Sequence, residues 1–296
     1  MTRRIVKIAT GIVLSLALGV GALASAWLAG IHVPIASGAT WMKVTKLSVA
    51  DNAGAPNGNF YILFIGSDLR PGVGGARGDA LHLIGVNPSQ HAATLINIPR
   101  DTCFNGDKVN AQNAAGGPRR QADAISQMVG VPISWVIEVD FAGFTSIIDG
   151  MGGFTVNVPT QMHDTYSGAY FSPGPQHMDG TQALAFSRDR HDFPSSDLVR
   201  TQNQGLLLLN ALSGMQQQAG GASGEFRLLA LFGRHAQLDG VGLTDLYRLG
   251  RIAHHLDASK IRNMEFPTAG GNCLATAGSA SSLFADFRDD VVLQTH

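Results

Sequence analysis

The chain has 296 residues, of which 45% are hydrophobic and 15% are charged, and its formal net charge is −1. This is enough apolar material for one large domain with a substantial core, or for two small ones. The balanced charge argues against a protein coated with positive charge for nucleic acid, so an anion-binding role must come from local clusters. The two cysteines, Cys103 and Cys273, have no CxxC partner, so a cysteine-rich zinc site is not expected.

The N-terminus is the first informative segment. Three basic residues precede a nearly uncharged run over residues 8–30, which is long enough to cross a bilayer as one helix. Basic residues before such a helix stay inside, so the rest of the chain is expected outside the cytoplasm. The alternative is a cleavable signal peptide, because Ala24-Ser25-Ala26 resembles a cleavage site. The continuing apolar run favours a retained single-pass anchor in the cell membrane, with residues 1–30 as cytoplasmic tip and transmembrane helix.

That location changes the interpretation of Cys103 and Cys273. In an oxidising compartment two isolated cysteines more often form a disulfide than remain thiols, so we predict a bridge between them. The alternative is a pair of buried, reduced cysteines that act as small apolar side chains.

The remaining chain alternates between strand-like and helix-like patterns. Residues 31–59 are predicted to be a connector with one amphipathic stretch at 41–49. Short apolar runs bounded by turn residues predict strands over 60–65, 80–86, 94–98, 136–139, 154–158 and 261–266. Helical periodicity and end signals predict helices over 141–151, 179–187, 201–218 and 244–256. Residues 60–296 are therefore predicted to form a single α/β domain with a mixed sheet and helices on both faces.

Charged residues flank three of the predicted strands. Asp68 follows the first strand, and Arg77 and Asp79 precede the second. In α/β sheets, ligands commonly bind at the carboxyl ends of strands, and two aspartates there could share Mg²⁺, which prefers oxygen ligands. Arg100 and Asp101 end the third strand, where a planar guanidinium can grip a phosphate. The ordinary alternatives are a turn-forming aspartate and a solvated ion pair.

The densest charged cluster lies between residues 187 and 204. It contains Arg188, Arg190, Asp197, Arg200 and Gln204. The first two arginines project to the same side if this stretch is extended. Arg200 and Gln204 lie one turn apart if a helix starts here. Three arginines near a helix start can bind an anion, and because the chain has few charges, an anion site is favoured over a solvated charge run.

Several familiar catalytic signatures are missing from the sequence. There is no GxSxG elbow and no HExxH, so a serine hydrolase or a zincin is unsupported. There is no Walker loop or dinucleotide fingerprint either.

Together the motifs resemble the LytR–CpsA–Psr family of cell-wall phosphotransferases. The matching stretches, in chain order, are FYILFIGSD, ARGD, NIPRD, KVNAQNAAGG, VDFAGFTSIIDGMGGFTVNVP, MDGTQALAFSRDRH and the D-x-x-R-x-x-x-Q of residues 197–204. Each motif alone is modest, but the ordered set over residues 60–212 is specific. One departure is Leu198-Val199, which stands where the family often has an aromatic residue and a glycine.

The resemblance implies a Mg²⁺-dependent transferase that joins a glycopolymer to peptidoglycan. The donor would be a polymer on a polyprenyl-pyrophosphate carrier, and the acceptor would be a sugar hydroxyl of the wall. The product would be a phosphodiester, with polyprenyl phosphate released. Arabinogalactan and teichoic acid are the candidate polymers. The alternatives are a lipid-pyrophosphate binding or regulatory module without turnover, and a pyrophosphatase that hydrolyses the lipid-linked glycan.

The resemblance also implies roles for individual residues. Asp68 and Asp79 would bind Mg²⁺. The pyrophosphate would be held by a basic and polar set: Arg77, Arg100, Lys108, Arg188, Arg190, Asp197, Arg200 and Gln204. Catalysis would fall to the arginines that neutralise charge, Arg100, Arg188 and Arg190, with Asp101 as a candidate base for the acceptor hydroxyl. The leucine-rich helix would either wall a groove for the lipid tail or form ordinary core.

Overall fold

The computed structural model describes residues 42–47, 58–68, 76–192, 196–219, 224, 227–228, 231–232, 236–271 and 273–293. The predicted anchor over residues 1–30 lies outside the described residues. Within the described part of the chain, no helix has the length and apolar character needed to cross a membrane.

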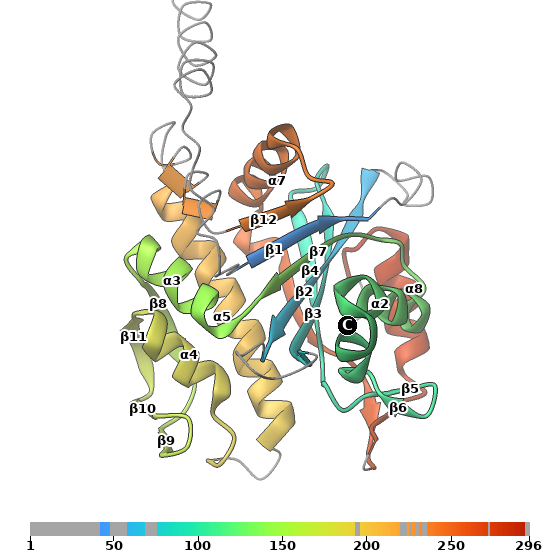
Figure 1. The fold of residues 1–296 in the computed structure, drawn as a ribbon, viewed down its shortest axis with the longest axis horizontal. Coiled ribbons are helices and arrows are strands. Elements are labelled where there is room, and N and C mark those ends of the chain that lie inside the picture. Colours follow the sequence, from blue (N-terminus) through green and yellow to red (C-terminus); the bar gives the residue numbers. More distant parts are fainter. Residues whose placement is uncertain are drawn as a thin grey trace, which may run out of the picture. The chain divides into compact units, whose positions relative to one another are not determined.

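A seven-stranded mixed sheet forms the centre of the domain (Figure 1). Its strands in spatial order are β12 (Ala236–Asp239), β1 (Met42–Lys46), β7 (Ile133–Val139), β2 (Phe60–Ser67), β3 (Gly78–Asn87), β4 (Ala92–Ile98) and β13 (Ile261–Glu265). The pairs β1–β7, β2–β3 and β3–β4 are antiparallel, whereas β1–β12, β2–β7 and β4–β13 are parallel. The predicted α/β domain with a mixed sheet is confirmed.

Strand β1 differs most from the sequence analysis. It lies within residues 31–59, which were expected to be a connector, yet it pairs with β7 on one side and β12 on the other. Val44 and Thr45 are buried, whereas Lys46 is exposed. A strand of five residues with two lysines gives too short an alternation to be separated from a helical pattern.

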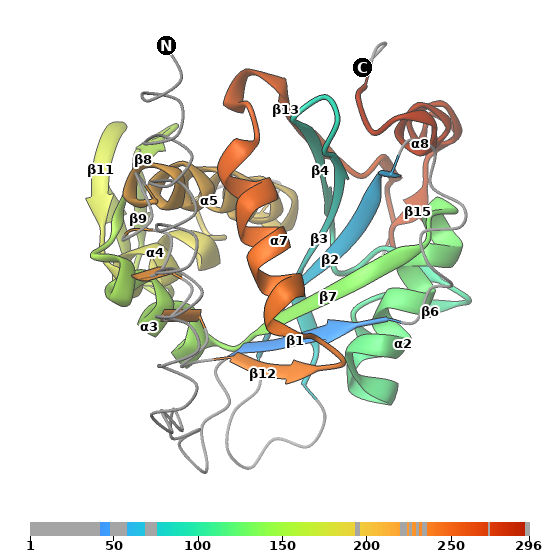
Figure 2. The ribbon, with the colours of Figure 1, turned by 90° about the horizontal axis from the view of Figure 1, so that it is seen from above.

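Helices cover both faces of the sheet (Figure 2). On one face, α2 (Ala111–Val129) and α8 (Ala280–Asp289) pack Ile125 and Phe287 against Leu63 and Leu83 of the sheet. On the other face lie α5 (Ser196–Gln218) and α7 (Leu243–His255). Because successive strand side chains point to opposite faces and both faces are covered, strands such as β2 are apolar along their whole length.

The sequence analysis did not predict α2 or α8. Inside α2, Gly116 and Gly117 have non-helical backbone angles, and Pro118 follows them, so the element is two helical pieces joined by a kink. Glycine and proline normally break a helix, and here they hide its periodicity. Helix α8 has 10 residues, and the sequence patterns considered above did not mark its ends.

A second apolar core lies beside the sheet. It is formed by α3 (Phe141–Met151), α4 (Gly180–Arg188), α5 and two small hairpins. The hairpin strands are β8 (Phe154–Val158) with β11 (Gly174–Met178), and β9 (Met162–Asp164) with β10 (Ala169–Phe171). The predicted strand over residues 154–158 therefore exists, but it pairs outside the central sheet. Asp179 caps α4, as expected, by accepting the N–H of Gln182 at 2.8 Å.

Candidate active site

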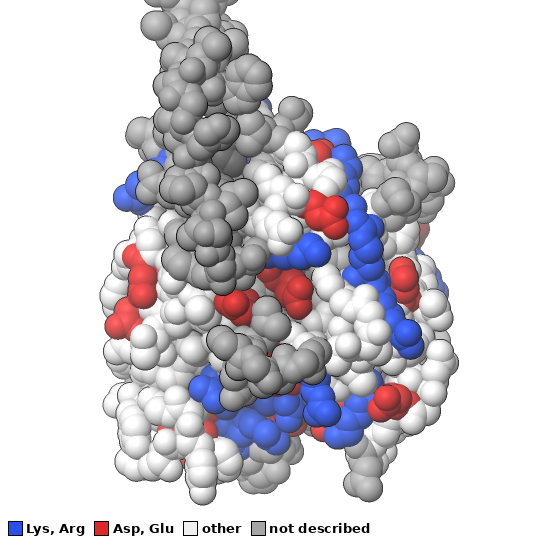
Figure 3. Space-filling view, in the orientation of Figure 1, with Lys and Arg blue, Asp and Glu red and all other residues white. Residues whose placement is uncertain are grey.

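A cavity of about 270 Å³ lies between the central sheet and helices α3, α4 and α5. Charged side chains from β3, the end of β4, the end of α4 and the start of α5 line it, together with apolar ones from β2, α3 and α5. The full lining is Phe64, Gly66, Asp79, Ala80, His82, Arg100, Val139, Asp140, Phe141, Phe144, Asp164, Tyr166, Ser167, Leu184, Ser187, Arg188, Arg190, His191, Arg200, Gln204, Leu207 and Leu208. Figure 3 shows basic side chains gathered over the lower part of the molecule with acidic ones among them.

Three arginines converge on the carboxylate of Asp197; we call Arg100, Arg190 and Arg200 the arginine cluster. The Oδ1 atom of Asp197 lies 2.6 Å from Nη2 of Arg200, 3.6 Å from Nε of Arg100 and 3.8 Å from Nε of Arg190. Arg100 also donates to Oδ1 of Asp79 at 3.0 Å. Asp101 lies 3.9 Å from Nε of Arg100, so the three arginines face three carboxylates here.

The electrostatics of this cluster favour a bound anion. Burial lowers the pKa of Arg200 to about 10, against the attraction of Asp197, and the neighbouring Arg100 and Arg190 lower it further. Burial also acts to lower the pKa of Arg100, but Asp79 and Asp197 outweigh it and raise that pKa. The Nε atoms of all three arginines are buried without a hydrogen-bond partner. Buried donors are normally paired, so an anion that reached these groups would satisfy them and relieve their mutual repulsion.

Arg188 and Gln204 complete the polar lining predicted from the sequence. The guanidinium of Arg188 lies 5.2 Å from the ring centroid of Phe141, at the start of α3. The Nε2 of Gln204 donates to the backbone oxygen of Ser187 at 3.0 Å. This bond joins α5 to the end of α4, so the two helices that carry the arginines are fixed to each other.

The two predicted magnesium ligands lie at the ends of neighbouring strands. Asp79 lines the cavity. Asp68 follows β2, and its Oδ1 accepts the backbone N–H of Arg77 at 2.9 Å. Among the described residues, no group of three or more His, Cys, Asp or Glu side chains is arranged to hold a metal ion. Mg²⁺ is often bound by only one or two carboxylates together with substrate phosphates and water, so this oxygen donor pair fits Mg²⁺ when a phosphorylated substrate supplies the other ligands.

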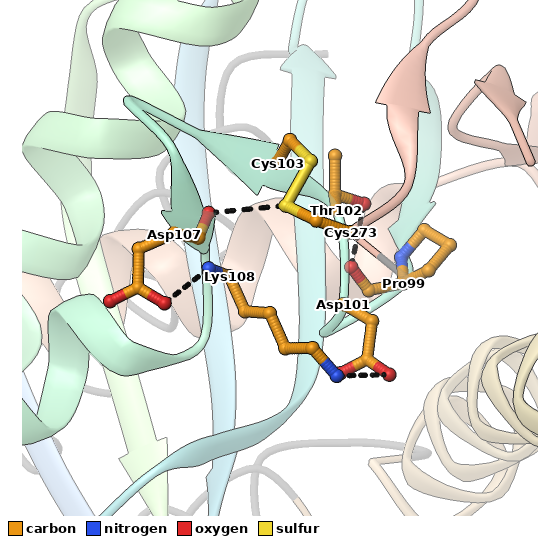
Figure 4. The surroundings of a disulfide bond; sticks show 7 residues. All are labelled: Pro99, Asp101, Thr102, Cys103, Asp107, Lys108 and Cys273. Carbon is orange, nitrogen blue, oxygen red and sulfur yellow. Dashed lines mark hydrogen bonds and ion pairs between the residues drawn. A yellow bond between two sulfur atoms is a disulfide. The ribbon is translucent and has the colours of Figure 1, made fainter. Parts of the chain in front are cut away.

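Five of the predicted site residues are not among those that line the cavity: Asp68, Arg77, Asp101, Lys108 and Asp197. Arg77 is exposed beside β3. Asp101 forms an ion pair with Nζ of Lys108 at 2.9 Å (Figure 4). Its carboxylate also lies 3.9 Å from Nε of Arg100. The carboxylate of Asp101 is therefore held by two cations outside the cavity lining.

A disulfide joins Cys103 and Cys273 beside this loop, with an S–S distance of 2.03 Å (Figure 4). Cys103 lies in β5 (Cys103–Phe104), which pairs with β6 (Asp107–Lys108). The N–H of Cys103 donates to the backbone oxygen of Leu274 at 2.8 Å, and β14 (Thr268–Ala269) and β15 (Ala275–Thr276) flank the second cysteine. The bridge therefore fastens the loop that carries Arg100 to a segment 170 residues away.

Sequence reasoning assigned no role to several residues that line the cavity. Asp164 and Tyr166 come from the β9–β10 hairpin, and His191 follows Arg190 directly. Their ring and hydrogen-bond contacts join segments 27 residues apart. The run Arg188–His191 signalled a charged segment, but no local pattern could show that the hairpin meets it.

The site is thus an arginine-lined cavity between the sheet of an α/β domain and a second helical core. Residues 33–283 match the model of the LytR_cpsA_psr family. The chain therefore belongs to the LytR–CpsA–Psr family.

Known relatives agree with this assignment. Over 149 residues the chain is 36% identical to TagU of Bacillus mycoides, a polyisoprenyl-teichoic acid–peptidoglycan teichoic acid transferase, covering 48% of each protein. The chain thus spans about half the length of the curated relatives it matches. A LytR-Csp2A-Psr enzyme from Actinomyces oris superposes with a TM-score of 0.67 at 25% identity, over 85% of this chain and 94% of that one. TagV of B. subtilis shares the fold, with a TM-score of 0.63 at 24% identity over 76% of this chain and 94% of that one.

Proposed function

We propose that this protein transfers a glycopolymer from a polyprenyl-pyrophosphate carrier to a sugar hydroxyl of peptidoglycan. The observation that carries the proposal is the arginine cluster, whose buried donors face a cavity that also has apolar walls. The curated relatives named as teichoic acid transferases support the reaction class and a glycopolymer as the cargo. Whether the cargo is a teichoic acid or another wall polymer, such as arabinogalactan, does not alter the chemistry at the phosphates.

The arginine cluster would receive the pyrophosphate of the donor. Guanidinium groups can bind phosphate oxygens with two parallel hydrogen bonds. Phosphoryl transfer asks a protein mainly to position the reacting groups and to neutralise developing charge. Arg190 and Arg200 would hold the bridging region of the pyrophosphate, and Arg188, fixed over Phe141, would contact the phosphate that leaves with the lipid.

Asp79 and Asp68 would hold Mg²⁺ once the substrate is in place. The ion would supply positive charge to the phosphate oxygens. Asp79 accepts a hydrogen bond from Arg100 through one carboxylate oxygen, so its second oxygen is the one suited to the ion. The same pairing fixes Arg100 toward the phosphates.

The apolar part of the lining suits an isoprenoid tail. Phe64 from β2, Phe144 from α3, and Leu207 and Leu208 from α5 all line the same cavity as the arginines. A pocket that joins apolar walls to a charged end matches an amphiphilic ligand. The N-terminal anchor expected over residues 1–30 would keep this pocket close to the membrane that holds the carrier.

The test is to incubate the full chain, in detergent, with a synthetic prenyl-pyrophosphate-linked oligosaccharide, a peptidoglycan oligosaccharide and Mg²⁺. The proposal predicts a phosphodiester-linked conjugate and release of prenyl phosphate. Release of prenyl phosphate without conjugate, at saturating acceptor, would identify a pyrophosphatase instead. Binding of the donor with no turnover would identify a binding or regulatory module.

A further inference from the structure

The proposed reaction needs a group that accepts the proton of the attacking hydroxyl. Among the carboxylates that line the cavity, Asp79 accepts a hydrogen bond from Arg100, and Asp140 caps α3 by accepting the N–H of Gly143 at 2.7 Å. Both carboxylates therefore already accept a hydrogen bond that fixes a neighbouring part of the protein. Asp101 faces Lys108 outside the cavity lining.

His191 differs from these groups because a buried carboxylate holds its ring. The Nδ1 of His191 lies 3.0 Å from Oδ2 and 3.1 Å from Oδ1 of Asp164, whose side chain is fully buried. Asp164 also accepts the backbone N–H groups of Tyr166 at 2.9 Å and Arg190 at 3.3 Å. Burial acts to raise the pKa of Asp164, but the hydrogen bonds, led by that of His191, hold the pKa well below its ordinary range.

The charge of Asp164 fixes which nitrogen of His191 carries the proton. An ionised carboxylate can only accept hydrogen bonds, so Nδ1 of the histidine must be the donor. The neutral ring then has its lone pair on Nε2, at the opposite edge. Tyr166 also holds the ring, with the two ring centroids 4.4 Å apart. His191 is about half exposed and lines the cavity beside Arg190, so its basic nitrogen is open to a ligand.

We propose that His191 is the general base of the proposed transfer, with Asp164 as the residue that positions it; the inference rests on the function proposed above. The acceptor oxygen forms a bond to the polymer-side phosphorus, and the bond from that phosphorus to the bridging oxygen breaks. Polyprenyl phosphate leaves with the electron pair of that bond. The hydroxyl proton passes to Nε2 of His191, and the resulting imidazolium, stabilised by Asp164, returns the proton to the leaving phosphate or to water.

Other titratable groups surround this pair and bear on its pH dependence. Asp189 is buried nearby, and its burial, with the charges of Asp192 and Asp164, raises its pKa to about 6. Asp192 accepts the backbone N–H of His163 on β9. Arg188 and Arg190 line the same cavity as His191. Because the pKa of Asp189, about 6, lies in the range of a histidine, a pH profile of the wild type alone cannot identify His191. The role of His191 is therefore tested by comparing the pH profiles of its variants with that of the wild type.

The experiment compares His191→Gln and Asp164→Asn with the wild-type chain in the transfer assay. Loss of a general base costs roughly a hundredfold to ten-thousandfold in kcat, so His191→Gln should fall by that much while retaining donor binding. In Asp164→Asn only one of the two backbone N–H groups keeps an oxygen acceptor, because Tyr166 donates to Oδ1 and Arg190 to Oδ2. An NH₂ group that faces Nδ1 favours the tautomer with a proton on Nε2. That variant should also lose kcat, and in both variants the rise of kcat with pH should disappear.

Matched controls separate the possible failures. His163→Gln changes an exposed histidine on β9 that is next to Asp164 but does not itself line the cavity, and should keep wild-type kinetics. Binding of geranylgeranyl pyrophosphate, measured by calorimetry, should be unchanged in His191→Gln, and because that histidine is half exposed its melting temperature should change little. Wild-type kcat and pH profile in His191→Gln would overturn the role of His191 and leave the proposed transfer standing. Absence of polymer transfer by the wild-type chain would overturn the proposed function, and the base with it.

Discussion

At the scale of single residues, the site depends on one carboxylate that holds several cations. Asp197 lies 2.6–3.8 Å from the arginine cluster, and its side chain is 19% exposed. Without this charge, Arg100, Arg190 and Arg200 would repel one another across the cavity. The predicted role of Asp197 beside the pyrophosphate is therefore best understood as organising the arginines.

Arg190 and Arg77 were both expected to hold pyrophosphate, but they occupy different environments. Arg190 lines the cavity, whereas Arg77 is exposed and lies outside the lining. We predict that Arg190→Ala lowers kcat by roughly a hundredfold or more, because it removes charge stabilisation at the phosphates. Arg77→Ala should cost less than about tenfold, since an exposed charge contributes little. Equal losses in steady-state transfer assays of the two variants would contradict this difference.

Glu265 provides a prediction about pH. Burial raises its pKa from 4.5 to about 7, although the hydrogen bond from Asn97 acts in the opposite direction. The folded state therefore binds a proton that the unfolded state has lost, and the stability from this group is full below pH 4.5 and is lost as pH rises through 7. In Glu265→Gln this loss should disappear, so the variant gains on the order of 2 kcal/mol over wild type across that window. Urea unfolding at several pH values measures the difference, and parallel stability curves for the two proteins would refute the assignment.

At the scale of elements, helix α5 must approach the sheet closely to bring Arg200 and Gln204 to the cavity. A Cβ atom on Gly205 would lie 2.3 Å from Oδ1 of Asn97 and 2.8 Å from Oδ1 of Asn263. The absence of a side chain at this position is what permits the approach.

We predict that Gly205→Ala destabilises the protein by about 1–3 kcal/mol, because the helix or the asparagines must move. Gly250→Ala is the matched control, since a Cβ there meets nothing within 4 Å and the residue is exposed in the interior of α7. That control should gain about 0.5–1 kcal/mol from helix propensity. If thermal unfolding showed the same change in stability for both variants, the inference that α5 packs closely against the sheet at Gly205 would be wrong.

The disulfide is the second feature that holds the elements of the site together. It closes a loop of 170 residues and fastens the segment that carries Arg100. Replacing Cys103 and Cys273 together by serine should lower the free energy of unfolding by about 2–4 kcal/mol. Urea denaturation measures the loss, and mass spectrometry of unreduced peptides checks the bond itself. Two free thiols in the unreduced protein would contradict the bridge.

The elements that sequence predicted well are those whose periodicity has no interruption. Helix 141–151 ends in Gly152, which adopts the left-handed conformation expected of a C-cap, and its predicted bounds match α3. Helix α2 was missed because a glycine pair and a proline interrupt it. The site residues were likewise predictable only where the signal is local in the sequence. Charged residues next to strand ends could be found along the chain, whereas the contact of Asp164 with His191 depends on how a hairpin packs against a distant helix end.

At the scale of the whole molecule, the cavity lies where two apolar cores meet. One is a core distinct from that under α2 and α8: it includes Val44, Phe60 and Trp135 and lies on the face of the sheet under α7 and α3. The other lies among α3, α4, α5 and the two hairpins. Arg100 comes from the sheet side, and Arg188, Arg190 and Arg200 come from the helical side. The charges can converge only when both cores have formed, so the folded domain as a whole builds the arginine-lined cavity.

The most direct test of this account is a crystal structure of the protein with geranylgeranyl pyrophosphate and Mg²⁺. The account predicts phosphate oxygens within hydrogen-bond distance of Arg190 and Arg200, a metal ion against Asp79, and the prenyl chain among Phe144 and Leu207. A ligand bound elsewhere on the protein, with the arginine cluster unchanged and empty, would contradict it.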